Sequence, residues 1–224
     1  LNYPFYAKEE LFKAAKEMGY LSDLSHLELK SPHLLEKYFS DKPKIYLDRF
    51  QSVIFEVAKK GNAVFFGKGS QLLLHNFDCA LHVLVTGSME KRLARLMRGM
   101  KIETSVAEKI IHTSDHDKAG FLKYAFNADW LNPHLYDITI NTDKLDVESA
   151  VAIVFSAAQS EDIKSCSTDA VEKLGKLSLQ RRVESSLLEA GVLSLRMFFV
   201  VENVETVRLY GIVHSEEEKE TVER

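Results

Sequence analysis

A short apolar run that ends in glycines decides the predicted fold: residues 63–66 read AVFF, and GKGS follows at 67–70. Short apolar runs beside glycines are typical of strands that are buried in a parallel sheet. The pattern returns as ALHVLV at 80–85, before TGS at 86–88, and as YDITIN at 136–141. We therefore expect three strands of one parallel sheet, each leading into a loop at its carboxyl end.

Amphipathic helices are predicted around these strands. Apolar residues recur at helical spacing, and the expected helices span residues 7–19, 46–60, 89–100, 104–114, 115–127 and 146–159. Strands that alternate with helices indicate an α/β fold, a parallel sheet with flanking helices. Ligands of such folds bind at the carboxyl ends of the strands, which here are the loops at 67–70, 86–88 and 141–143. Residues 20–45 carry mixed signals, and short helical pieces and loops are expected there.

The C-terminal part differs in charge and in pattern. Residues 1–160 hold 20 basic and 20 acidic side chains, whereas residues 161–224 hold 9 and 13, the whole net charge of −4. The tail pattern predicts a helix at 178–190, strands at 195–201 and 205–213, and a further helix from residue 214. We predict a large domain at 1–159, a linker that merges into a helix at 160–177, and a small α+β module at 178–224.

The composition excludes several classes of protein. A net charge of −4 gives no global attraction to nucleic acid or to an anionic membrane. Two cysteines are too few for a disulfide framework and fit a reducing compartment. No apolar run reaches the ~18–20 residues that span a bilayer. We expect a cytoplasmic protein without a nucleic-acid partner or a transmembrane segment; a homodimer is one arrangement that the sequence leaves open.

The loop at 67–70 contains the first candidate for phosphate binding, Lys68. A phosphate-cradling loop needs two glycines with four residues between them, then Lys and then Ser or Thr. The GKGS sequence does not match that pattern, and a tight turn at the end of the strand explains its glycines. Because Lys68 follows the carboxyl end of a predicted strand, a phosphate-facing role stays open.

A basic cluster lies on the helix predicted at 89–100. Arg92, Arg95 and Arg98 are spaced three apart, so their side chains drift slowly around one face of that helix. A guanidinium binds phosphate oxygens with two parallel hydrogen bonds, which makes such a cluster suitable for phosphate recognition. The alternative is a charged helix face that only contacts solvent.

Residues 115–118 read DHDK and place two carboxylates beside a histidine. Side chains two apart do not share a helix face, so we expect no metal ion between Asp115 and Asp117. The favourable position of carboxylates at the start of a helix accounts for both residues. The eight histidines of the chain show no metal-ligand spacing either, and no metal site is expected.

Five segments then combine in a fixed order. They read YPFYAKEELFKAAKEMG (3–19), GNAVFFGKGSQLLL (61–74), ALHVLVTGSMEKRLARLM (80–97), SVAEKIIHTSDHDKAGFLKYAFNADW (105–130) and YDITINTDKLDVESAV (136–151). In this order they resemble the cytidylate-kinase-like family of nucleoside-monophosphate kinases, with 105–130 similar to its mobile lid. The resemblance implies a P-loop-kinase fold and phosphoryl transfer from ATP, with Mg²⁺, to CMP or a related nucleotide.

The resemblance also implies roles for six side chains: Arg92, Arg95 and Lys118 in catalysis, and Lys68, Arg98 and Asp115 in binding of the nucleotide or its phosphates. Lys68 and Lys118 stand where the family has arginine, and lysine lacks the arginine fork. The phosphate-binding loop of the family precedes the part that matches residues 3–19. We therefore expect about 25 further residues, one strand, loop and helix, ahead of Leu1, and expect these 224 residues alone to be inactive.

The tail resembles a BON module. SLQRRVESSLLEAG at 178–191 is similar to its first helix, and VRLYGIVHSEEEKETVER at 207–224 to a strand and its second helix. The ligand of such a module is not indicated by the sequence. Two functions remain open: a cytidylate-kinase-like phosphotransferase, or a catalytically degenerate kinase fold that senses a nucleotide or binds a protein, coupled to the tail.

Overall fold

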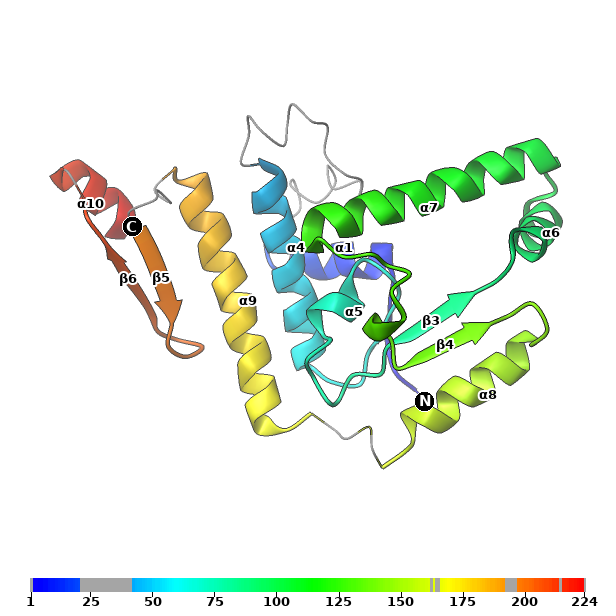
Figure 1. The fold of residues 1–224 in the computed structure, drawn as a ribbon. Coiled ribbons are helices and arrows are strands. Elements are labelled where there is room, and N and C mark those ends of the chain that lie inside the picture. The colour runs from blue at the N-terminus through cyan, green and yellow to red at the C-terminus, as the bar shows by residue number, and fades with distance from the viewer. Residues whose placement is uncertain are drawn as a thin grey trace. The chain divides into compact units, whose positions relative to one another are not determined.

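The computed structural model describes residues 2–20, 42–161, 163, 166–191, 197–213 and 215–223. The described strands form three two-stranded sheets, accompanied by helices, so the fold is mixed α/β (Figure 1). Contacts divide the chain into two compact units. One unit holds the described residues of 74–165, and the other holds those of 2–73 and 166–223. Most of the stretch predicted at 20–45 lies outside the described residues.

Two parallel strands form the sheet of the first unit. Strand β3 (Val83–Thr86) pairs with β4 (Ile138–Asn141), in a register that joins Val83 to Ile138 and Thr86 to Asn141. Because the strands end at the same level, the loops at 86–88 and 141–143 follow side by side (Figure 1). Both predicted strands and their parallel pairing are confirmed.

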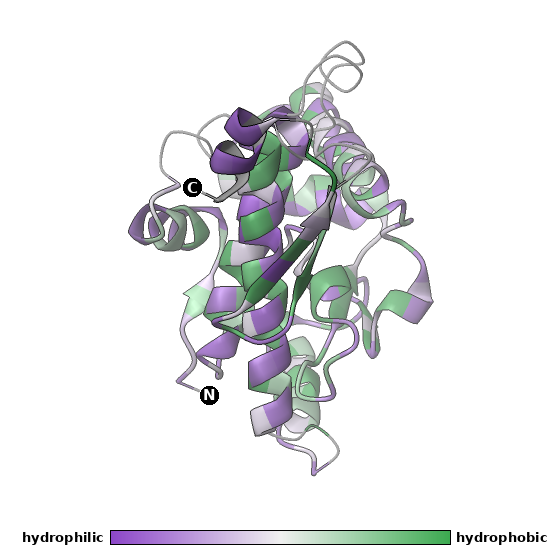
Figure 2. Cartoon of the chain, turned by 90° about the vertical axis from the view of Figure 1, so that its left-hand side faces the viewer, coloured by the Kyte–Doolittle hydropathy of each residue, from purple (hydrophilic) through white to green (hydrophobic). Residues whose placement is uncertain are grey.

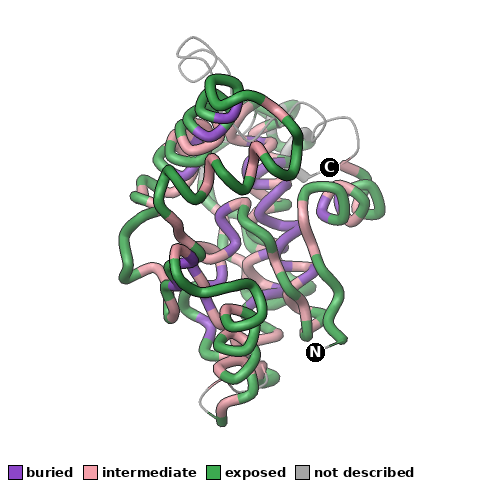
Figure 3. The backbone as a smooth tube through the Cα atoms, turned by 90° about the vertical axis from the view of Figure 1, so that its right-hand side faces the viewer, coloured by how far each residue is buried: buried purple, intermediate pink, exposed green. Residues whose placement is uncertain are grey.

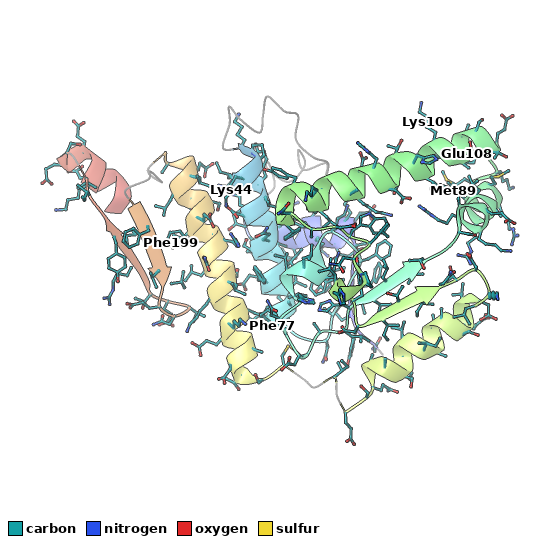
Figure 4. The ribbon with its side chains drawn as sticks, in the orientation of Figure 1. Lys44, Phe77, Met89, Glu108, Lys109 and Phe199 are labelled. Carbon is teal, nitrogen blue, oxygen red and sulfur yellow. The ribbon has the colours of Figure 1, made fainter. Side chains whose placement is uncertain are left out.

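Helix α6 (Met89–Met100) follows β3 and has the bounds expected from the sequence. It begins after Ser88, whose hydroxyl accepts a hydrogen bond from the backbone N–H of Lys91 at 3.4 Å. It packs against helix α7 (Thr104–Phe126). Figure 4 labels Met89 at the start of α6 and two charged side chains, Glu108 and Lys109, on α7.

Helix α7 corrects the predicted pair of helices at 104–114 and 115–127. The two segments form one continuous helix, and the buried residues Ala107, Ile111, Phe121 and Leu122 lie along its whole length. Packing of this apolar side outweighs the local capping tendency of the Ser-Asp pair at 114–115. Asp115 therefore lies in the middle of a helix, and the explanation by the helix start is wrong.

The first unit closes with a short 3₁₀ turn, η1 (Pro133–Leu135), and with helix α8 (Val147–Ala158). Asp146 caps α8 by accepting a hydrogen bond from the backbone N–H of Ser149 at 2.8 Å. Neither α6 nor α8 contains a fully buried residue, and exposed and intermediate colours cover both in Figure 3. The helix predicted at 146–159 is confirmed.

The strand predicted at 63–66 behaves differently from the expectation. Strand β2 (Val64–Phe65) pairs in parallel with β1 (Phe5–Tyr6), a strand that the sequence did not predict. Among the described residues β2 has no other strand partner. Val64 and Phe66 are exposed, so the prediction that this run is buried in one sheet with β3 and β4 is wrong.

Two long helices build the core of the second unit. Helix α4 (Lys42–Lys59) buries Phe50, Val53 and Ile54 and packs against α1 (Lys8–Glu17) and against α9 (Thr168–Glu189). Helix α5 (Ser70–Leu73) follows β2. Helix α9 begins inside the stretch read as a linker, because Ser167 caps it through a hydrogen bond from the backbone N–H of Ala170 at 3.1 Å.

The α4–α9 contact contains a cluster of four charged side chains. The Nζ atom of Lys44, labelled in Figure 4, lies 2.7 Å from a carboxylate oxygen of Asp48 and 2.7 Å from one of Glu184. The guanidinium of Arg181 lies 3.3 Å from Asp48 and 3.0 Å from Glu184. Burial raises the pKa of Asp48, although its hydrogen bond with Lys44 opposes the shift.

The tail has the predicted order of elements. Strands β5 (Met197–Val201) and β6 (Val207–Gly211) pair antiparallel, and helix α10 (Glu216–Glu223) follows. The turn between the strands includes Asn203, whose side chain accepts a hydrogen bond from the backbone N–H of Glu205 at 2.9 Å. Figure 2 shows apolar segments on the hairpin, where Phe198 is exposed and stacks on Tyr210.

No helix in the described parts of the chain combines the length and the apolar character that a membrane span requires.

Candidate functional site

Residues of helices α6 and α7 line a wide, open cavity in the first unit. The cavity has a volume of about 390 Å³ and is lined by Arg92, Arg95, Leu96 and Ile111. The two arginines come from the same face of α6, as their spacing predicts. Two arginines and two apolar side chains therefore line the cavity.

Arg92 is held by a carboxylate of the neighbouring helix. Its Nη1 and Nη2 atoms donate hydrogen bonds of 2.6 and 2.8 Å to the two carboxylate oxygens of Asp115. This two-point contact is the strongest geometry for an arginine–carboxylate pair. The hydrogen bond from Arg92 holds the pKa of Asp115 below its usual value, and the same bond raises the pKa of Arg92. Asp115 is thus ionised at neutral pH and balances the charge of Arg92.

Arg95 is held by neutral groups instead. Its Nη1 donates to the hydroxyl of Thr142 at 2.8 Å, and its Nη2 donates to the carbonyl of Thr142 at 2.6 Å. The hydroxyl of Thr142 in turn donates to the carbonyl of Thr86 at 2.8 Å. Within the described residues no carboxylate pairs with Arg95, so its guanidinium is fixed in place while its positive charge stays uncompensated.

The two loops that follow β3 and β4 hold these groups together. The backbone N–H of Thr142 donates to the carbonyl of Thr86 at 3.0 Å, and the backbone N–H of Ser88 donates to the carboxylate of Asp143 at 2.7 Å. A Cβ atom at Gly87 would lie 3.4 Å from the side chains of both Thr142 and Asp143. The loops therefore form one compact platform next to the start of α6.

Lys118 lies one turn after Asp115 on α7. Its Nζ atom lies 3.8 Å from the Asp115 carboxylate and 5.5 Å from the centre of the Trp130 ring, over its face. An ammonium group over an indole face is attracted by the electrons of the ring. The structure thus brings Lys118, Asp115 and Arg92 into one chain of contacts.

The remaining two predicted residues lie outside this group of contacts. Arg98 is exposed near the end of α6 and has no ion pair within the described residues. Lys68 belongs to the other unit, after β2, in a turn where residues 67–69 all have positive φ. That turn suits its two glycines.

The described residues lack two features of an ATP site, a phosphate-binding loop and a metal site. No sequence of two glycines four residues apart, followed by Lys and Ser or Thr, occurs in the 224 residues. Among the described residues, no three His, Cys, Asp or Glu side chains gather in a group that could hold a metal ion. These residues therefore do not fit the ATP phosphates, and we derive no step through ATP or Mg²⁺. Arg92 and Arg95 line the cavity, and within the described residues no carboxylate pairs with Arg95.

The comparisons with known proteins agree with an α/β kinase-like class of protein. The model of the Cytidylate kinase-like family matches residues 1–144. A cytidylate kinase of Methanocaldococcus jannaschii is 32% identical over 148 residues, which cover 64% of this chain and 75% of that protein. A crystal structure of an uncharacterized protein from Eubacterium ventriosum has a TM-score of 0.57 at 20% identity and covers 71% of this chain and 86% of that one.

The chain therefore belongs to the cytidylate kinase-like family, and its function is nucleotide-kinase-like at the level of that family. The crystal structure is similar in fold alone. The roles of the six residues predicted from the sequence stay predictions.

Sequence reasoning missed the part played by Thr142. The loop at 141–143 was expected near a ligand, because it follows a strand of a parallel sheet. Nothing in the local pattern connects Thr142 to Arg95, which lies 47 residues earlier. Only the pairing of β3 with β4 brings the two residues together.

Proposed function

We propose that this protein binds CMP or a related nucleoside monophosphate and takes part in the transfer of a phosphoryl group to it from ATP. The observation that carries the proposal is the state of Arg95, which lines the cavity, is fixed by Thr142 and has no carboxylate partner among the described residues. Membership of the cytidylate kinase-like family supports the choice of ligand and reaction.

The chain's own residues would bind and orient the acceptor. Arg95 donates its remaining N–H groups to phosphate oxygens, and Arg98, one turn further along α6, adds a second positive charge. Arg92 joins them only if the phosphate competes with Asp115 for its guanidinium. Binding of a dianion by such groups is mostly a matter of position and charge neutralisation, which is what phosphoryl transfer requires of a protein.

A coupled assay of the whole gene product with ATP, Mg²⁺ and CMP tests the reaction. We expect ADP to form faster than without protein, and faster with CMP than with AMP or UMP in its place. Formation of ADP at the protein-free rate with every monophosphate would contradict the proposed reaction.

A second function, a nucleotide sensor without catalysis, is favoured by one observation. Lys118 stands where the family's lid has an arginine, and here it contacts Asp115 and the Trp130 ring. Calorimetric titration with CMP separates the two functions. Heat of binding without ADP formation supports the sensor, whereas no heat with any monophosphate contradicts both functions.

The tail is proposed as a BON-like module at 178–224, joined through residues 160–177 to the domain at 1–159. Support comes from the order of α9, β5, β6 and α10. Because α9 packs against α4, expression of residues 166–224 alone tests whether the tail folds without α4. A cooperative unfolding transition of this fragment would support an independent module, and an unfolded fragment would contradict it. A cytoplasmic location and a homodimer stay predictions, which fractionation and light scattering test.

A further inference from the structure

We propose that Thr142 is a positioning residue that sets the guanidinium of Arg95 for an anionic ligand. Thr142 meets Arg95 at two atoms, the hydroxyl and the carbonyl oxygen, at 2.8 and 2.6 Å. Two hydrogen bonds to one residue fix the plane of a guanidinium as well as its position. The inference rests on the proposed function, since it assigns a role in the same anion site.

The direction of the hydroxyl hydrogen bonds makes this role specific. A threonine hydroxyl has one hydrogen to donate and lone pairs with which to accept. Because Arg95 can only donate, the hydroxyl of Thr142 accepts from Arg95 and gives its own hydrogen to the carbonyl of Thr86. The Thr86 carbonyl therefore fixes the direction of the Thr142 lone pair that accepts the hydrogen bond from Arg95. This relay of hydrogen bonds, from Arg95 through the Thr142 hydroxyl to the Thr86 carbonyl, connects the end of β3 to the cavity.

The surroundings hold Thr142 still. Its side chain is buried, with 9% of the residue exposed, and its backbone N–H donates to the same Thr86 carbonyl at 3.0 Å. Gly87 lies so close that a Cβ atom there would touch the Thr142 hydroxyl oxygen at 3.4 Å. A rigid acceptor reduces the entropy that a long arginine side chain loses when an anion binds. The relay thus prepares Arg95 before the ligand arrives.

The partners of Arg95 also preserve its charge. A carboxylate in the place of Thr142 would hold the guanidinium equally well and would cancel its positive charge, as Asp115 does for Arg92. A hydroxyl and a carbonyl position the group through dipoles only. Thr142 therefore holds the Arg95 side chain in place without cancelling the positive charge that would attract a phosphate.

A double-mutant cycle measured by calorimetric titration with CMP tests the proposal. Arg95→Gln is expected to weaken CMP binding by about tenfold to a hundredfold, the usual range for a hydrogen bond to a charged group. Thr142→Val, which has the same shape without the hydroxyl, is expected to weaken it by about tenfold. In the Arg95→Gln background, Thr142→Val should have no further effect, and Thr142→Ser should retain nearly native binding in the native background.

The cycle separates failure of this proposal from failure of the proposed function. If the native chain binds CMP and Arg95→Gln does not, but Thr142→Val binds like the native chain, the positioning role is overturned and the proposed function stands. Equal losses from Thr142→Val in both backgrounds would overturn it too, because they indicate a general structural role. If Arg95→Gln binds CMP normally, the proposed anion site is wrong. Should Thr142→Val not fold, Thr142→Ser decides, since loss of CMP binding by that folded variant overturns the proposal.

Discussion

Arg92 and Asp115 join α6 to α7 through two parallel hydrogen bonds of 2.6 and 2.8 Å. The Asp115 carboxylate balances the positive charge of Arg92, which lines the cavity. Arg95, which also lines the cavity, is held by Thr142 alone. One face of α6 thus carries one arginine whose charge is balanced by a carboxylate and one arginine whose charge is not.

Asp115→Asn removes the negative charge beside Arg92 and keeps the shape of the side chain. We expect CMP to bind several-fold more tightly, because the phosphate no longer competes with a carboxylate for Arg92. The pair is partly exposed, so the free energy of unfolding should fall by only about 0.2–1 kcal/mol. Calorimetric titration and urea unfolding measure the two effects.

Glu108→Gln is the matched control for that change, since Glu108 is an exposed carboxylate on the same helix (Figure 4). It should leave both quantities nearly unchanged. Weaker CMP binding by Asp115→Asn would show that Asp115 contacts the nucleotide itself, as the resemblance to the kinase family implies, and would contradict the competition with Arg92.

Because of His82, we expect the free energy of unfolding to decrease in mild acid. Its side chain is buried, and its Nε2 atom has no hydrogen-bond partner in the described part of the chain. Burial lowers the pKa of His82 below 6.5, in spite of the nearby Asp137. As the pH falls below 6.5, the unfolded state binds a proton before the folded state does, so the free energy of unfolding decreases until the lowered pKa is passed.

Urea unfolding between about pH 7 and about pH 5 measures this dependence. The native chain should lose more stability over that range than His82→Asn, which cannot take up the proton. His134→Asn, at an exposed position, should behave like the native chain. An identical pH dependence of the native chain and His82→Asn would refute the account of His82.

Asp48 is a buried carboxylate in the contact between α4 and α9, and we expect it to stabilise that contact. Its side chain is 1% exposed and lies between Lys44 and Arg181. Asp48→Asn removes one carboxylate of the cluster, while Glu184 still contacts both Lys44 and Arg181. The expected loss of stability is therefore about 1–3 kcal/mol, the cost of disturbing a buried hydrogen-bonded group. Urea unfolding should show a loss of that size.

Glu56→Gln is the control for Asp48, because Glu56 pairs with Lys59 on the same helix at a more exposed place. Its effect should be about 0.5 kcal/mol or less. Equal effects of the two substitutions would mean that the buried cluster does not hold α9 against α4.

Local patterns in the sequence predicted most elements of the first unit. The apolar spacing placed α6 correctly, and the runs at 80–85 and 136–141 indicated β3 and β4. The sequence could not show that 104–126 is one helix, because Ser114 and Asp115 form a favourable helix start when read alone. Strand β1 was missed because two residues that precede a strong helix signal carry no readable period.

The sequence placed Arg92 and Arg95 on one helix face, as candidates for phosphate binding or as a solvent-facing charged surface. Both line the cavity, and their role in binding stays a prediction. Their different partners depend on contacts with residues 23 and 47 positions away. Such contacts follow from the packing of α7 and the pairing of β4, which local periodicity does not encode.

Titration of the chain with CMP and with cytidine tests the central claim, that Arg95 provides an anion site, most directly. Cytidine lacks the phosphate, so it separates recognition of charge from recognition of the base. Arg95→Gln is compared with Lys91→Gln, which removes one positive charge from the exposed part of the same helix. We predict that Arg95→Gln weakens CMP binding by about tenfold or more, that Lys91→Gln leaves it nearly native, and that neither changes the weak binding of cytidine. Equal CMP affinities of Arg95→Gln and Lys91→Gln would contradict the account.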